Sequence, residues 1–291
     1  MKKIQSIIIS FVFITFFTVF FSCEKDITID TPKAEEKIVV EGWIDLNDFS
    51  KVMLTKNLPF FGTIDSSMIL NLIIQDAEVI VSDGITNDTL IKALDFDVFP
   101  PIYYQGTKIK GEAGKTYTLK IEAQGKILTA HTTIPNPVLI DTLWFKKEPN
   151  HDSLGYVWGF FTDPTEYGDN YRIFTKRLQK DKRFFPVFGS VFEDKFFNGQ
   201  SFQFSLMRGS GSSSYMHEDQ EFGYYKIGDT IIVKACTIDR IHYDFWRSAE
   251  GAMHSGANPF SNPTQIASNI EGGGLGIWGG YGAFYDTIIA K

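Results

Sequence analysis

Apolar and polar residues alternate with a period of two through much of the first half of the chain. One run carries its apolar side chains on a single face, at Tyr117, Leu119, Ile121 and Ala123. The pair Gln124-Gly125 follows this run and marks a turn into a second strand, which is a strong hairpin signal. Similar alternation over residues 37–46 and 76–84 predicts further half-buried strands of an antiparallel sheet. Residues 37–135 are therefore predicted to form an immunoglobulin-like or transthyretin-like β-sandwich.

The strand pattern is interrupted at Pro135 and Pro137. Proline cannot donate a hydrogen bond to a strand partner, so a domain boundary is predicted here. Beyond it, apolar strand-like runs recur at residues 156–163, 201–208 and 229–238. Residues 238–252 place apolar side chains three and four apart, which predicts one amphipathic helix with Thr237 as its cap. Residues 138–291 are therefore predicted to form a second, mostly β, sandwich-like domain with one helix.

The first 22 residues have the features of a bacterial lipoprotein signal peptide. Two lysines precede an apolar run over residues 4–21, and the small residue Ser22 ends it. Cys23 follows directly, which resembles the lipobox in which the thiol is acylated after cleavage between Ser22 and Cys23. Two phenylalanines in the last apolar positions depart from the usual lipobox. A retained transmembrane helix and plain secretion are the alternatives.

Residues 23–36 are acidic and without periodicity, which predicts a tether between the lipid and the folded body. The formal net charge of the whole chain is −7, and cleavage of a leader with two lysines and no acid makes it more negative. This acidic balance argues against nucleic acid as a partner. The chain has two cysteines, Cys23 and Cys236, so acylation of Cys23 excludes an intramolecular disulfide.

A glycine-rich stretch near the C-terminus contains Gly274, Gly276 and Gly279 in the spacing G-x-G-x-x-G. A dinucleotide loop requires a helix after this motif and an acid about twenty residues further on. Twelve residues follow Gly279, and they end in a strand-like run. We therefore interpret the glycines as positions where a strand bends or approaches another surface, and no cofactor is predicted.

No catalytic or metal-binding residue is assigned. The five histidines are scattered, and no G-x-S-x-G motif is present. The loop over residues 162–170 holds Asp163, Glu166 and Asp169, but it lacks the acid spacing of a calcium loop and is interpreted as a turn. Cys236 is interpreted as a buried structural thiol. The chain is predicted not to be an enzyme, although folding can bring two distant carboxylates together, as in a hydrolase.

Several aromatic residues near predicted turns are candidates for contact with a ligand or partner. They are Tyr103, Tyr104, Tyr215, Trp278 and Tyr281. Exposed aromatic rings recur at binding surfaces, where they stack on ligands or anchor a partner. Packing at the edge of the core is the alternative, since aromatic side chains are more often buried.

Four stretches together resemble one protein family. They cover residues 22–27, 38–44, 111–121 and 258–281. The family they resemble is domain of unknown function 4249, a group of Bacteroidota outer-membrane lipoproteins. The resemblance implies a surface-facing lipoprotein of the outer membrane, often encoded beside TonB-dependent transporters. It carries over no catalytic residue.

The expected function is therefore a non-enzymatic binding or accessory subunit. The protein would be held at the outer membrane through lipid on Cys23, beside a TonB-dependent transporter or another barrel. The alternative is an adhesin or glycan-binding lipoprotein that uses exposed aromatic rings. A hydrolase with carboxylates brought together by folding is a third hypothesis.

Overall fold

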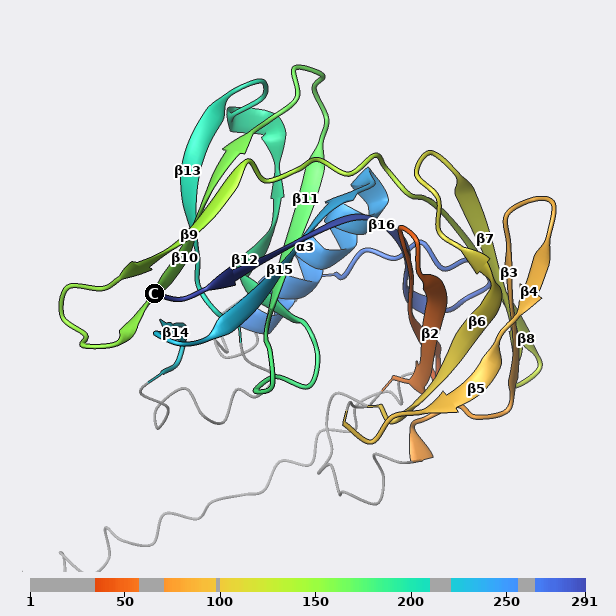
Figure 1. Cartoon of the computed structure of the whole chain (residues 1–291). Helices are drawn as coiled ribbons and strands as arrows, with labels where there is room; N and C mark the ends of the chain where they lie inside the picture. Colours follow the sequence, from red (N-terminus) through yellow and green to blue (C-terminus); the bar gives the residue numbers. More distant parts are fainter. Residues whose placement is uncertain (1–34, 58–70, 98–99, 210–220, 256–264) are drawn as a thin grey trace, which may run out of the picture. The chain divides into compact units, whose positions relative to one another are not determined.

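Three sheets and one long helix make up the described part of the chain. The computed structural model describes residues 35–57, 71–97, 100–209, 221–255 and 265–291. The predicted signal peptide, Cys23, nearly all of the predicted tether and Tyr215 lie outside the described residues. Residues 36–291 cluster into one unit by their internal contacts. The observed architecture is mainly β, as the alternation of side chains predicts (Figure 1).

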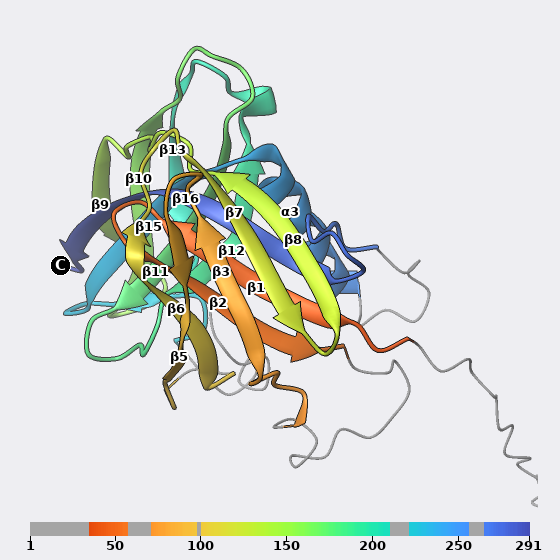
Figure 2. The ribbon, with the colours of Figure 1, turned by 90° about the vertical axis from the view of Figure 1, so that its right-hand side faces the viewer.

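An eight-stranded sheet contains strands from both halves of the chain (Figure 2). Its order is β12-β11-β15-β16-β1-β2-β6-β5. The strands are β1 (Ile38–Asp45), β2 (Phe49–Lys56), β5 (Ile91–Leu94), β6 (Ile102–Lys110), β11 (Asn170–Arg177), β12 (Phe185–Glu193), β15 (Thr230–Ile238) and β16 (Leu275–Ile289). The long strand β16 lies in the middle and joins the two halves through its pairs with β1 and β15.

Each half of the chain also contributes a four-stranded sheet. The first consists of β3 (Ala77–Ser82), β4 (Asn87–Thr89), β7 (Thr116–Ala123) and β8 (Lys126–Thr133). The second consists of β9 (Thr142–Lys147), β10 (Leu154–Thr162), β13 (Ser201–Leu206) and β14 (Tyr225–Lys226). The short 3₁₀ helix η1 (Asp194–Phe196) follows β12, and helix α3 (Arg240–Ser255) follows β15.

The predicted hairpin of β7 and β8 is confirmed. Ala123 pairs with Lys126 across a two-residue turn. Gln124 and Gly125 have φ values of 52° and 73°, the left-handed conformation that a tight turn between two twisted strands requires. The side chains of β7 alternate between buried and exposed, so this strand buries one face only.

Three apolar clusters form the interior. The first joins the β1 and β2 region to the first four-stranded sheet, and it includes Val40, Val79 and Leu119. The second joins β11 and β15 to the second four-stranded sheet. The third lies under α3 and includes Ile238 and Tyr243. Trp278 of β16 belongs to the first cluster, so the C-terminal part of the chain supplies a side chain to the core of the N-terminal part. The division at residues 135–138 stays a prediction.

The glycine-rich motif lies in and just before strand β16, not in a loop that leads to a helix. Gly276 has a φ of 114°, and a Cβ at this position would lie 1.9 Å from the carbonyl oxygen of Val40. A Cβ on Gly279 would lie 2.2 Å from the ring of His242. The glycines therefore permit close approach of β1 and α3, as predicted. The antiparallel pairing predicted for β1 is observed with β2, whereas β1 pairs with β16 in parallel.

Helix α3 confirms the helix predicted near residues 238–252, but its cap differs from the prediction. The Asp239 carboxylate accepts a hydrogen bond from the backbone N–H of His242 at 2.8 Å. Thr237 still belongs to β15, and its hydroxyl accepts a hydrogen bond from the N–H of Val138 instead. Within the described ranges, none of the helices combines the length and apolar character that a membrane crossing requires.

Candidate functional site

Of the four candidate aromatic contact residues that lie within the described ranges, three are buried. Trp278 is 0 % exposed, Tyr104 is 3 % exposed and Tyr281 is 4 % exposed. The expectation that these three rings contact a ligand or partner is therefore wrong. Packing at the core, the alternative, describes them, because β16 and β6 turn these side chains inward. Tyr103 is half-buried, and its role as a contact residue stays a prediction.

The polar atoms of these buried aromatic residues have partners inside the protein. The indole N–H of Trp278 donates to the carbonyl of Tyr117 at 3.0 Å. The Tyr104 hydroxyl accepts a hydrogen bond from the N–H of Ala77 at 3.1 Å. The Tyr281 hydroxyl accepts one from the Arg172 guanidinium at 2.7 Å. These hydrogen bonds satisfy groups that would be costly to bury unpaired.

Two other aromatic rings are exposed at one end of the second four-stranded sheet. Tyr167 lies in the loop 163–169 between β10 and β11, and its side chain is 70 % exposed. Phe196 ends η1 and is 85 % exposed. The two segments lie beside each other in both views of the chain (Figures 1 and 2). We call loop 163–169 and residues 194–199 together the clasp.

The carboxylate of Asp194 holds the two segments of the clasp together. Asp194 is 2 % exposed, and its Oδ2 accepts hydrogen bonds from the backbone N–H groups of Gly168 at 2.6 Å and Asp169 at 3.0 Å. The N–H of Asp194 donates to the carbonyl of Asp169. Hydrogen bonds to a charged carboxylate are about twice as strong as neutral ones. Tyr167 is therefore presented on a fixed backbone.

A second buried carboxylate, that of Asp163 at the start of the loop, also joins the two segments of the clasp. Its Oδ1 accepts a hydrogen bond from the Tyr171 hydroxyl at 2.6 Å, and its Oδ2 accepts one from the N–H of Gly199 at 3.1 Å. The side chain of Asn198 donates to the carbonyl of Thr165 at 3.2 Å. Loop 163–169 is a turn, as the sequence indicates, and distant residues fix its conformation.

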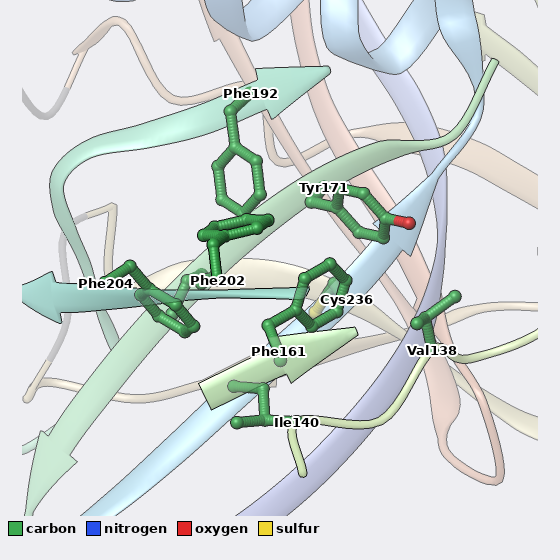
Figure 3. Close-up of a pocket in the computed structure, with 10 residues that line it drawn as sticks. Val138, Ile140, Phe161, Tyr171, Phe192, Phe202, Phe204 and Cys236 are labelled. Carbon is green, nitrogen blue, oxygen red and sulfur yellow. The ribbon is translucent and has the colours of Figure 1, made fainter. Parts of the chain in front are cut away.

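Packed aromatic rings support the clasp from the interior. Phe161 and Phe202 pack edge to face with ring centroids 5.7 Å apart, and Tyr171 stacks on Phe197. The rings of Tyr171, Phe192 and Phe202 line a cavity of about 20 Å³ (Figure 3). This volume has room for about one water molecule, and its lining is apolar. The cavity is too small for an organic ligand.

Negative charge accumulates around the clasp. Burial raises the pKa of Asp169, and the nearby carboxylates of Asp163 and Asp194 raise it further. Burial and the hydrogen bond to Asp163 also raise the pKa of Tyr171, so this phenol stays neutral. The buried carboxylates Asp163 and Asp194 accept structural hydrogen bonds, which assigns them to positioning the loops. Among the described residues, no set of three or more His, Cys, Asp or Glu side chains is arranged to hold a metal ion.

A second group of charged side chains lies buried under α3. Lys234 of β15 and Asp45 of β1 form an ion pair at 2.6 Å across the intervening strand β16. The guanidinium of Arg172 lies 3.4 Å from the ring centre of Trp246. Cys236 is 2 % exposed, so the prediction of a buried thiol is confirmed, and burial raises its pKa to about 12. These contacts join β1, β11 and β15 to helix α3.

The stability of this group is expected to depend on pH through His242. Burial, together with the positive charge of Arg172, lowers the pKa of His242 to about 3 from 6.5. Folding therefore favours the neutral imidazole, so the stabilisation is complete above pH 6.5 and is lost as the pH falls from 6.5 towards 3. Between pH 7 and pH 4 the free energy of unfolding should fall by about 3 kcal/mol more in the wild type than in His242→Gln. Urea unfolding at a series of pH values measures this, and parallel pH profiles would contradict it.

Comparison with known proteins identifies the family. A family model described as a domain of unknown function (DUF4249) matches residues 24–284. The chain belongs to this family. Comparison with curated proteins found no match. The DUF4249 match covers both segments of the clasp and most of β16, and it confirms the resemblance seen in the sequence. The DUF4249 description assigns no activity.

The two exposed rings of the clasp were not predicted from the sequence. The stretch 162–170 is distinguished in sequence by its three acids, and nothing in the pattern marks Tyr167 in the same turn as an exposed ring. Phe196 lies within a run of two phenylalanines, and no sequence pattern distinguishes the exposed Phe196 from Phe197, which packs inward.

Proposed function

We propose that the protein is a non-enzymatic binding or accessory subunit held at the outer membrane by lipid on Cys23, beside a TonB-dependent transporter or another barrel. Cleavage takes place between Ser22 and Cys23, and the folded body faces the cell surface. What supports the anchor is the leader sequence together with the lipoprotein character that the family resemblance implies. The clasp is the surface that contacts the partner.

One observation carries the binding role. Tyr167 and Phe196 are large aromatic side chains exposed to solvent, yet the loops that bear them are fixed by buried carboxylates. An aromatic side chain on a fixed backbone loses little conformational freedom on binding and buries a large area. Such residues therefore dominate interfaces. Neither ring packs in the core, so burial of these two side chains contributes little to the stability of the protein.

A crosslinked pull-down from native membranes tests this role. The wild type should capture a membrane protein, and the double variant Tyr167→Ala/Phe196→Ala should lose at least about tenfold of the captured amount, since two anchor rings contribute on the order of 2 kcal/mol. Cys23→Ala should lose the partner because the protein no longer reaches the membrane. Phe96→Ala is the matched control, since Phe96 is 84 % exposed and lies outside the clasp. Equal capture by the wild type and the double variant would show that the clasp is not the surface that contacts the partner.

A second candidate function is glycan binding by the same surface. What favours it is the presence of carboxylates at Glu166 and Asp169 beside the rings, because sugars are held by ring stacking and by hydrogen bonds to their hydroxyl groups. Glycan arrays probed with the wild type and with the same double variant separate the two functions. Binding to a neutral glycan that depends on Tyr167 and Phe196 would favour the adhesin.

A further inference from the structure

The clasp differs in charge from an ordinary aromatic patch. Residues 163–169 carry three acids and no base, and residues 193–199 carry two acids and one base. Glu193 is paired with Arg240 at 2.9 Å, which neutralises one of these charges. Asp163 and Asp194 are buried and engaged with the backbone. Glu166 is exposed and Asp169 is half-buried, so these two carboxylates are the ones that a partner reaches.

The rings themselves are suited to a cation. The Nζ of Lys195 lies 5.7 Å from the ring centre of Phe196, so this ring interacts with an ammonium group of the same chain, which a cation of the partner would displace. A cation over an aromatic face gains about 0.5–2 kcal/mol, and carboxylates close to the ring add to the attraction. Burial and the neighbouring negative charges raise the pKa of Asp169 because they destabilise its ionised form. A nearby cation would stabilise that ionised form.

Other occupants fit this surface less well. A neutral glycan can donate hydrogen bonds to these carboxylates but gains no attraction between opposite charges. A membrane with anionic headgroups would be repelled by Glu166 and Asp169. The cationic side chain of a basic segment can contact the aromatic rings and is also attracted to the carboxylates.

We propose that the clasp recognises a lysine- or arginine-bearing segment of a protein partner, with a cationic side chain between the rings of Tyr167 and Phe196 and the carboxylates of Glu166 and Asp169. This inference rests on the proposed binding role of the clasp and names the chemistry of its partner. The segment is held by cation–π contact and by charge, so its affinity falls as salt screens the carboxylates.

Binding of synthetic peptides to the full mature chain tests the inference. The probes are a lysine- and arginine-rich peptide, an acidic peptide of equal length, and vesicles of neutral lipid, each followed by fluorescence anisotropy or co-sedimentation. We expect the basic peptide to bind at low salt and to weaken steeply at high salt. Tyr167→Ala and Phe196→Ala should each weaken it by about 3- to 30-fold. Glu166→Gln should weaken it and reduce the salt dependence.

Two controls and a second readout keep the outcomes distinct. Phe96→Ala and Glu78→Gln change an exposed ring and an exposed carboxylate elsewhere and should leave the affinity unchanged. Circular dichroism confirms that each variant is folded. Equal binding of basic and acidic peptides, or ring-dependent binding of neutral glycans or lipid vesicles instead, would overturn the basic partner. If the membrane pull-down still depends on the rings in that case, the proposed function stands and only this inference fails.

Discussion

Gly276→Ala is expected to prevent stable folding, with a loss of about 4 kcal/mol or more in the free energy of unfolding. The new Cβ would lie 1.9 Å from the carbonyl oxygen of Val40, and the φ of 114° is one that residues with a side chain rarely adopt. Relief of the clash requires β1 and β16 to separate, and this pair is the junction between the two halves of the eight-stranded sheet. Thermal or urea unfolding of the purified variant measures the loss.

Gly251→Ala is the matched control for this substitution. Gly251 lies within α3, and a Cβ at this position would meet no atom within 4 Å. Alanine has the higher helix propensity, so this variant should gain about 0.5–1 kcal/mol. A Gly276→Ala protein that unfolds at the same denaturant concentration as the wild type would show that β16 does not approach β1 as described.

Asp45→Ala is expected to cost about 3–5 kcal/mol of unfolding free energy, because it leaves the ammonium group of Lys234 buried without a counter-charge. The side chains of the pair are 8 % and 9 % exposed. The ring centres of Tyr281 and Phe174 lie 4.8 Å and 5.4 Å from the Lys234 Nζ, and these rings replace only part of the lost attraction. Urea unfolding at neutral pH measures the loss.

The double variant Asp45→Ala/Lys234→Met separates a buried charge from a general packing defect. Removal of both charges should recover most of the lost stability, since an apolar pair avoids the desolvation penalty. The exposed pair of Lys182 and Asp97, at 3.3 Å, is the control, and Asp97→Ala should cause no measurable change. A double variant that is less stable than Asp45→Ala would contradict this account of the pair.

Local pattern predicted the strands and the helix because each depends on a short-range periodicity. The alternation in β7 and the turn at Gln124 and Gly125 need only neighbouring residues, and both are observed. The helical spacing of α3 is likewise local, although its cap is Asp239 and not Thr237. Both hydroxyl and carboxylate side chains cap helices, so sequence alone does not choose between two adjacent candidates.

The candidate site was harder to predict, because exposure of an aromatic ring depends on distant residues. Trp278 lies among glycines in a stretch that reads as a turn, yet it is a core residue of a strand between β1 and β15. The exposed Tyr167 lies in a loop whose backbone is bound by Asp194, 27 positions further along the chain. Hydrogen bonds between residues so far apart in the chain produce no periodic pattern in the sequence.

The sequence by itself determined the β class, the hairpins, the amphipathic helix and the family, since these follow from side-chain alternation, turn residues and local motifs. The leader and Cys23 are also local signals, and their roles stay predictions. Only the tertiary structure decided that β16 joins both halves of one sheet in parallel with β1, that Trp278 and Tyr281 are buried, and that hydrogen bonds join the segments that bear Tyr167 and Phe196. The physical reason is that strand order and exposure arise from contacts between segments far apart in the chain, whereas periodicity records only the face that each segment buries.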